Sequence, residues 1–318
     1  MAGSQWESDV ERFLDNLPPS TNKYTYKGKE QFDQILQNEK HRLHKLPPRQ
    51  PLGSEISDYF VIFIDPSTFE QDFLLSDLLA GTSLFYNAAL HALILRMSTP
   101  EHAQVSYGLQ TEFTKILLPM GLCDAVEGFG NVNVNVGDGN VKRPDWGWAP
   151  LRPPRGAPRR PGVVLEVGVS ETETKLRDDA SMWVDPLRGQ VKTAITIKVN
   201  RKKPELKLDK WEWDAGAQRP RVTQSCVIGK APNNVTVSQH PITIPFDHIF
   251  GRAPEIPREA DIRLGKESLA NMARYVWSTQ DHPGVSLDLN TGSMTVIIQY
   301  CGPKTYSQIP TRPTVVLA

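Results

Sequence analysis

The sequence predicts an α/β fold in which a mixed β-sheet lies between helices. A near-continuous apolar run at 162–169 is typical of a strand that is covered on both faces. A helix is expected to follow, because Ser170 and Glu173 have the spacing of a capping box. A second β-branched strand is expected at 191–199, and its distance from the first matches a right-handed βαβ crossover.

The first hundred residues are expected to be mainly helical. Apolar residues at helical spacing predict a helix that ends before Pro18, and a polar helix is expected at 29–43. A short strand is expected at 59–64. The apolar segment 74–97 is interpreted as a buried helix, because its polar residues would be costly in a lipid bilayer.

Residues 101–118 continue a helix that begins at Pro100, and the pattern then changes to strands. Later elements are expected as strands at 132–136, 142–149, 205–213 and 221–228, a helix at 266–277 and a hairpin at 286–300. We therefore expect a helical leader (1–50), a strand and apolar helix that pack on the core (51–100), the core (101–213), C-terminal strands and a helix (214–302), and a loose tail (303–318).

The composition limits the classes of protein. The chain has 318 residues with 36 Lys and Arg against 36 Asp and Glu, so its formal net charge is zero. A globally basic nucleic-acid wrapper is excluded, whereas a local basic surface is not. Three distant cysteines without a CxxC motif favour a reducing compartment. The N-terminus has no apolar signal-peptide core, so we expect an intracellular protein, cytoplasmic or nuclear, without membrane contact; an oligomer is compatible with the sequence.

Two acidic residues occupy positions where a charge is costly. Asp145 ends the triplet Arg143-Pro144-Asp145 in an expected strand, and Glu166 lies in the middle of an apolar strand. An ionised carboxylate in such a strand is expensive unless it is paired or bound to a metal. Two carboxylates on neighbouring strands could share Mg²⁺ or Mn²⁺. The alternative is a structural role, in which Asp145 caps a turn and Glu166 pairs with a buried cation.

These segments resemble the restriction-endonuclease-like PD-(D/E)XK superfamily over about residues 101–200. The resemblance is carried by Arg143-Pro144-Asp145, by the strand 163–168 with its Glu166, and by the helix that begins at 170–173. Uncharacterised fungal members and, more distantly, small endonuclease-like proteins of cyanobacteria look similar. The resemblance implies a three-layer core of order αβββαβ with N-terminal helical and C-terminal helix and hairpin extensions.

The resemblance also implies an activity, a metal-dependent phosphodiesterase (nuclease) that acts on DNA or RNA. Asp145, Glu166 and the Val167 carbonyl would then hold Mg²⁺ or Mn²⁺, which lowers the pKa of a bound water and neutralises the phosphate. The superfamily pattern has a lysine two residues after the acidic residue, where this chain has Gly168. That lysine helps to stabilise developing charge, so its absence leaves open a catalytically inactive module that binds nucleic acid or protein. A third hypothesis is an interaction protein in which Glu166 is only structural.

Three further residues could complete such a site. Lys198 on the next strand and Lys175 in the following helix could each supply the missing amine, or each could be a solvated lysine. Glu112, at the edge of the apolar stripe of its helix, could hold the metal or a water. Its alternative role is an ion pair with Lys115.

A basic, proline-rich segment follows the first acidic motif. Six cations fall within 19 residues: Lys142, Arg143, Arg152, Arg155, Arg159 and Arg160. The resemblance places this loop near the site, where its arginines suit phosphate contacts and the interleaved Trp146 and Trp148 could stack on bases. The alternative is a solvated loop with both tryptophans in the core.

Overall fold

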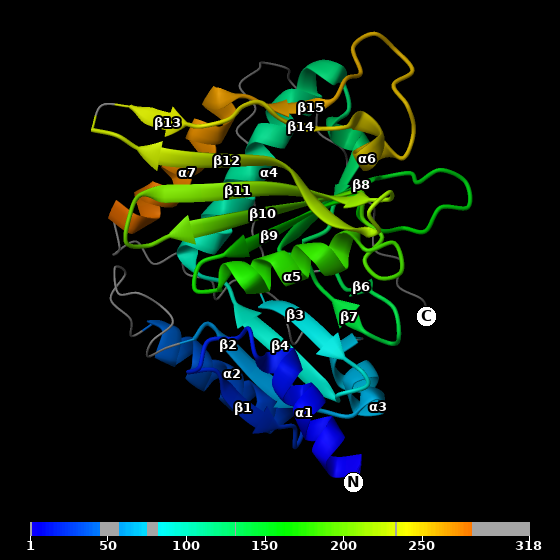
Figure 1. Ribbon diagram of the computed structural model, residues 1–318, viewed down its shortest axis with the longest axis vertical. Helices are drawn as coiled ribbons and strands as arrows, with labels where there is room; N and C mark the ends of the chain where they lie inside the picture. The colour runs from blue at the N-terminus through cyan, green and yellow to red at the C-terminus, as the bar shows by residue number, and fades with distance from the viewer. Residues whose placement is uncertain (1, 45–56, 75–81, 131, 233, 282–318) are drawn as a thin grey trace, which may run out of the picture. The chain divides into compact units, whose positions relative to one another are not determined.

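The computed structural model describes residues 2–44, 57–74, 82–130, 132–232 and 234–281, and within them three β-sheets with their helices (Figure 1). The predicted α/β class is confirmed. The hairpin expected at 286–300 and the tail at 303–318 lie outside the described residues. None of the described helices has the length and apolar character needed to cross a bilayer.

The larger sheet has seven strands in the order β13-β12-β11-β10-β9-β8-β5. Their bounds are β5 Val126–Gly128, β8 Trp146–Pro150, β9 Val163–Gly168, β10 Thr193–Asn200, β11 Glu205–Asp214, β12 Arg219–Lys230 and β13 Val235–Val237. Strands β9 and β10 are parallel, and every other neighbouring pair is antiparallel. The expected crossover from β9 to β10 is therefore present.

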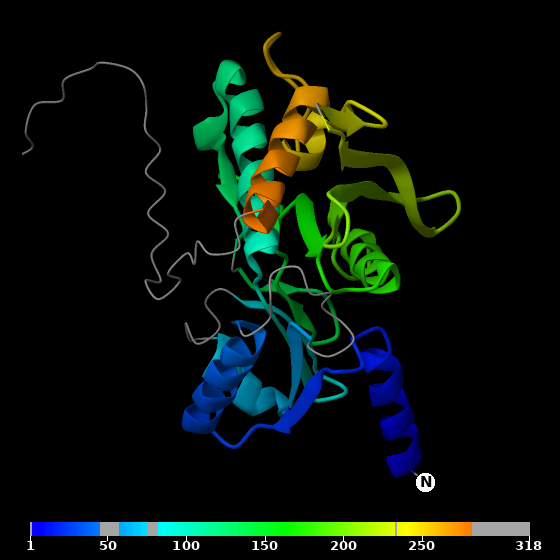
Figure 2. The same ribbon diagram turned by 90° about the vertical axis from the view of Figure 1, so that its left-hand side faces the viewer.

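Helices cover both faces of this sheet (Figure 2). Helices α4 (Pro100–Met120) and α7 (Lys266–Asp281) pack on one face with Val163, Leu165 and Val167. Helix α5 (Glu173–Val184) packs on the other face with Val164. The alternation expected for β9 is therefore observed, and it leaves Glu166 on the α5 face.

The smaller sheet has six strands in the order β1-β2-β4-β3-β7-β6. Their bounds are β1 Asn22–Thr25, β2 Tyr59–Phe63, β3 Thr82–Asn87, β4 Ala92–Met97, β6 Val134–Asn135 and β7 Val141–Lys142. Helix α1 (Ala2–Leu14) packs on the face that carries Val61, and α2 (Lys29–His44) packs on the face that carries Phe60. A short helix α3 (Pro66–Phe69) and a π-helical turn (Glu70–Leu74) follow β2.

The helix predicted at 74–97 is wrong, because its described part forms the antiparallel hairpin β3–β4. All six residues of β4 are buried, since the smaller sheet is covered on both faces. An uninterrupted apolar run has no period that distinguishes a buried strand from a buried helix. The segment 51–100 therefore contributes a hairpin to a second sheet instead of a helix packed on the core.

The strand predicted at 142–149 is divided between the two sheets. Val141–Lys142 form β7 of the smaller sheet, whereas Trp146–Pro150 form β8 of the larger one. Asp145 thus lies at a bend before β8 and not within a strand. The chain crosses from one sheet to the other at this point, which brings the smaller sheet beside the acidic motif.

The start of helix α5 differs from the expectation, and further elements complete the fold. Helix α5 is capped by Thr172, whose side chain accepts a bond from Lys175 N, so the capping box at Ser170 is wrong; Ser170 donates to Asp58 instead. The rings of Trp148 and Phe113 stack at 4.1 Å in the core. The elements not yet described are a 3-10 turn (Cys123–Ala125), β14 (Ile242–Ile244), α6 (Phe246–Phe250) and β15 (Ile262–Leu264), which the sequence did not predict, as it did not predict β1, α3, the π-helical turn, β5 or β13.

Candidate functional site

The structure brings Asp145 and Glu166 together. Trp146 pairs with Leu165 across β8 and β9, so Asp145, one residue earlier, lies opposite Glu166. Both side chains are buried, with exposed fractions of 0% and 2%. Asp145 Oδ2 also accepts a hydrogen bond of 2.7 Å from the backbone N–H of Val167.

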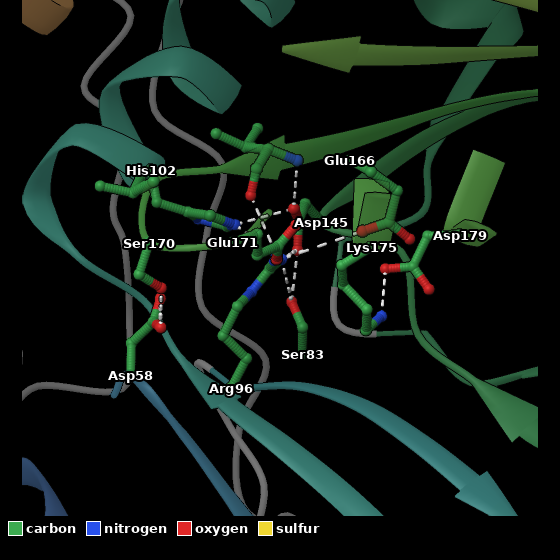
Figure 3. Close-up of polar contacts among 12 residues, drawn as sticks. Asp58, Ser83, Arg96, His102, Asp145, Glu166, Ser170, Glu171, Lys175 and Asp179 are labelled. Atoms are coloured by element: carbon green, nitrogen blue, oxygen red, sulfur yellow. Dashed lines mark hydrogen bonds and ion pairs between the residues drawn. The ribbon is translucent and has the colours of Figure 1, made fainter. Parts of the chain in front are cut away.

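The guanidinium of Arg96, on β4 of the smaller sheet, lies against this pair (Figure 3). Nη2 forms an ion pair with Asp145 and lies 3.9 Å from Glu166 Oε2. Nη1 donates a 2.9 Å hydrogen bond to the Val167 carbonyl. The three groups that the sequence assigned to a metal ion are therefore all in contact with one internal cation.

Arg96 is held from several further elements. Its Nη1 pairs with Glu171, which follows β9, and its Nη2 approaches Ser83 of β3 at 3.3 Å. His102, in the first turn of α4, places Nε2 2.8 Å from Asp145 Oδ2. Burial alone would raise the pKa of Asp145, but Arg96 and His102 hold it well below its usual range. Asp145 is therefore an ionised carboxylate that is fully paired within the protein.

Glu166 belongs to a second group of contacts on the α5 side. Its Oε1 accepts a 2.6 Å hydrogen bond from Trp183 Nε1 and lies 3.4 Å from Lys142 Nζ. Lys142 also pairs with Asp179 at 2.8 Å, and Lys175 pairs with Asp179 at 2.5 Å. Burial raises the pKa of Glu166 to about 8, whereas Lys142 and Lys175 outweigh burial at Asp179 and lower its pKa to about 2. Burial therefore favours the protonated form of Glu166.

The two lysines proposed to replace the pattern lysine do not reach the acidic pair. Lys175 is held by Asp179, as described above. Lys198 pairs with Gly168 in the β9–β10 register, as its strand predicts, but its amine donates to the backbone carbonyls of Val169 (3.2 Å) and Glu171. Burial lowers the pKa of Lys198, and the two carbonyl bonds fix its amine away from Asp145.

Leu176 occupies the space that a side chain at position 168 would need. A Cβ built at this position would lie 2.5 Å from Cδ1 and 3.0 Å from Cγ of Leu176, which is itself buried. Helix α5 therefore packs directly on the backbone of β9 at the place where the superfamily pattern has its lysine. The glycine is explained by this close packing.

Glu112 and Arg143 have structural roles. Glu112 pairs with Lys115 at 2.7 Å within α4, which is the alternative that the sequence left open, and in the described part of the chain it forms no hydrogen bond or ion pair with Asp145 or Glu166. Arg143 is buried, and it donates to the Thr82 carbonyl (3.2 Å) and to Asn133 Oδ1 (3.1 Å). The Arg143 guanidinium therefore forms its hydrogen bonds within the protein, which does not support the predicted phosphate contact.

The proline-rich loop 151–162 lies at the other end of β8 from Asp145 (Figure 1). Since β8 has five residues, the two are separated by roughly 17 Å of strand. The expectation that this loop hangs near the acidic site is therefore wrong. Arg159 pairs with Glu127, and Arg160 donates to the Asn135 carbonyl at 2.9 Å.

Base stacking by the two tryptophans is not supported by their positions. Trp148 is buried against Phe113, and the half-buried ring of Trp146 lies over Gly128 and Gly130. A Cβ at either glycine would come within 2.5 Å of that ring, so both glycines make room for it. The core alternative given for these tryptophans is therefore the observed one.

Sequence reasoning missed Arg96, His102 and Lys142 as members of the site. Arg96 is a single charge in the apolar run Ala92–Met97, which is the same signal that singled out Glu166. The sequence did not point to Arg96, because the interpretation of 74–97 as a helix hides the buried strand in which this charge lies. Lys142 was counted only as part of the local positive charge.

The residues present do not fit a divalent cation in this arrangement. The predicted ligands are in contact with Arg96, and burial favours the protonated form of Glu166. Within the described ranges, no three His, Cys, Asp or Glu side chains form a group that could hold a metal ion. The adjoining cavity, lined in part by Lys142, Lys175 and Asp179, has about 20 Å³, enough for about one water.

Comparison with known proteins assigns no family to the chain. No protein-family model matches it, and no curated protein matches its sequence.

Gly168→Ala is expected to destabilise the protein by about 1–3 kcal/mol, because the added methyl overpacks the contact with Leu176. Chemical denaturation measures the free energy of unfolding. Gly216→Ala is the control, since its Cβ would meet only Asp214 at 3.4 Å. In a Leu176→Ala background the cost of Gly168→Ala should largely disappear; an unchanged cost there would show that Leu176 is not its cause.

The stability of the protein is expected to fall as the pH rises from about 4.5 to about 8. Between the ordinary pKa of 4.5 and the folded value of about 8, the folded state keeps the Glu166 proton that the unfolded chain releases. Glu166→Gln, which imitates the neutral acid, should flatten this dependence. Melting temperatures across that range test it, with the exposed Glu11→Gln as control; parallel curves for wild type and Glu166→Gln would contradict it.

Proposed function

We propose that this chain is a restriction-endonuclease-like module that binds nucleic acid without cleaving it. The order of elements supports the first half of the proposal. Helix α4, the antiparallel strands β5, β8 and β9, helix α5 and the parallel strand β10 have the order of the αβββαβ core, although β6 and β7 of the smaller sheet intervene between β5 and β8. In this proposal, Asp145 before β8 and Glu166 in β9 correspond to the two acidic residues of the motif.

The position of Arg96 carries the proposal that the module is not catalytic. One guanidinium contacts Asp145, Glu166 and the Val167 carbonyl, the groups that would otherwise hold the metal. Displacing it would leave buried carboxylates without their partner, and breaking a buried ion pair costs about 3–5 kcal/mol. A fixed internal cation pairs with Asp145 and Glu171 but has no exchangeable position at which a water could be activated.

Two further observations support the same conclusion. Leu176 fills the space next to Gly168, so the pattern lysine has no room. The cavity beside Glu166 is too small for a phosphodiester, because it holds about one water.

Nucleic-acid binding is supported by the exposed loop after β8. Arg152 and Arg155 are exposed and have no ion pair among the described residues. Arginine recognises phosphate oxygens through paired N–H donors. The prolines of the loop limit the conformational entropy that binding would cost.

One observation favours a second candidate, a metal-dependent nuclease. Lys142 places an amine 3.4 Å from Glu166, so two acids and an amine lie together although the lysine comes from β7. This candidate requires the Arg96 guanidinium to leave the acidic pair. The two candidates therefore differ in a single measurable property, the ability to bind a divalent cation.

Wild-type protein is expected to leave labelled DNA and RNA uncut in Mg²⁺ or Mn²⁺, and calorimetry should show no Mn²⁺ binding, because Arg96 holds the ligands. Metal-dependent cleavage that Glu166→Gln and Lys142→Met both abolish would overturn this result and establish the second candidate. Lys23→Met, an exposed position on β1, is the matched control, and circular dichroism verifies folding of each variant.

Arg152→Ala combined with Arg155→Ala is expected to weaken nucleic-acid binding and to reduce its salt dependence. Each lost duplex phosphate contact should lower the log–log slope by about 0.9. Fluorescence anisotropy at several salt concentrations measures both quantities. The control removes two exposed cations from the other end of the larger sheet, Lys202 and Lys203. Equal slopes for wild type and the arginine variant would contradict the role of this loop.

A further inference from the structure

A second loop lies beside the arginine loop at the same end of the larger sheet. It covers residues 185–192, between α5 and β10. Because β9 and β10 are parallel, the two loops, each of which precedes one of these strands, lie at the same end of the sheet. Lys192 N donates to the Gly162 carbonyl at 2.8 Å, and the side chain of Arg160 donates to that of Gln190. The two loops are thus in direct contact.

Exposed cations from both loops lie at this end of the sheet. The first loop presents Arg152, Arg155 and Arg159, and the second presents Arg188 and Lys192. Arg159 pairs with Glu127, and Arg188 lies 3.9 Å from Asp185. Arg152, Arg155 and Lys192 have no ion pair in the part of the chain that the structure describes. The local charge is positive in a chain whose net charge is zero.

The acidic residues near this end of the sheet do not pair with all of these cations. Glu127 and Asp185 each face one arginine of the two loops, and Asp138 is the exposed acid of the adjoining hairpin. That hairpin touches the second loop, since a Cβ at Gly137 would lie 3.3 Å from the Leu187 carbonyl. Glu212 and Asp247, which surround His248, also lie near Lys192, but none of these acids forms an ion pair with Arg152, Arg155 or Lys192 among the described residues.

The geometry suits an extended polyanion. Strands β8, β9 and β10 are neighbours, so the loops that join them spread over two strand spacings, about 10 Å. A nucleic-acid backbone presents a regular row of phosphates to such a surface. The exposed Leu151 and Leu187 are single side chains on separate loops and form no apolar face for insertion into lipid.

We propose that loops 151–162 and 185–192 form one surface that binds the phosphate backbone of nucleic acid at the end of the sheet opposite to Asp145. This inference rests on the proposed nucleic-acid binding and adds the second loop to it. Arg188 and Lys192 are more than 25 residues from the first loop's Arg160, so only the fold unites them. A backbone bound here lies away from the acidic pair, which is consistent with binding that does not lead to cleavage.

The experiment compares three double variants of the full chain: Arg188→Ala with Lys192→Ala, Arg152→Ala with Arg155→Ala, and the control Lys202→Ala with Lys203→Ala. Each removes two exposed positive charges. Fluorescence anisotropy is measured with a short labelled duplex and a short labelled single strand over a salt series. Both loop variants are expected to bind about fivefold to tenfold more weakly than wild type, with a log–log slope lower by up to about 1.8. The control should stay near the wild type.

Each other outcome identifies what fails. If Arg188→Ala/Lys192→Ala binds like wild type while Arg152→Ala/Arg155→Ala binds weakly, the shared surface is wrong and the proposed function stands. If the wild type binds no nucleic acid, the proposed function itself is wrong. If the wild type instead binds vesicles of phosphatidylserine and phosphatidylcholine, and both loop variants lose that binding, the surface recognises a membrane and the inference is overturned.

Discussion

The buried guanidinium of Arg96 joins the two sheets electrostatically. Arg96 belongs to β4 of the smaller sheet, whereas its carboxylate partners Asp145 and Glu171 flank β8 and β9 of the larger one. Charges this deeply buried are tolerated only when they are paired, and removal of one partner leaves the other uncompensated. The position of β4 against β9 therefore follows from a charge requirement as well as from apolar packing.

The protonation of Glu166 follows from the same charge balance. Three cations, Arg96, Lys142 and Lys175, face the carboxylates Asp145, Glu171 and Asp179, so a fourth carboxylate has no full partner. Glu166 lies 3.4 Å or more from the nearest cations, and burial raises its pKa to about 8. A neutral acid that accepts a hydrogen bond from Trp183 is the inexpensive solution inside a protein. Burial thus favours the protonated form of the residue that suggested a metal site, and it also raises the pKa of the neighbouring Asp58.

Much of the larger sheet could be predicted from the sequence, because β9, α5 and β10 show clear periodicity and β11 and β12 alternate. The pairing of Asp145 with Glu166 followed from the same pattern. The hairpin β3–β4 could not be predicted, since a strand buried on both faces has the composition of a buried helix. Arg96 could not be assigned to the site for the same reason, since it lies in β4. The break between β7 and β8 had a signal in Pro144, which interrupts a strand, but residues 142–149 were interpreted as one strand although they leave one sheet and enter another.

The contacts around Gly168 and Arg96 form two separate obstacles to nuclease chemistry, and they come from different layers. Leu176 belongs to α5, which packs on one face of β9, whereas Arg96 belongs to a strand of the other sheet. A lysine restored at position 168 would collide with Leu176, and it would still find Asp145 bound to a guanidinium. Removal of Arg96 alone would free the carboxylates and enlarge the cavity that it lines beside Glu166, but Leu176 would still fill the space next to Gly168. Because neither change compensates for the other, the acidic pair is better explained as the attachment point of the smaller sheet, and the proposed binding surface lies at the opposite end of β8 and β9.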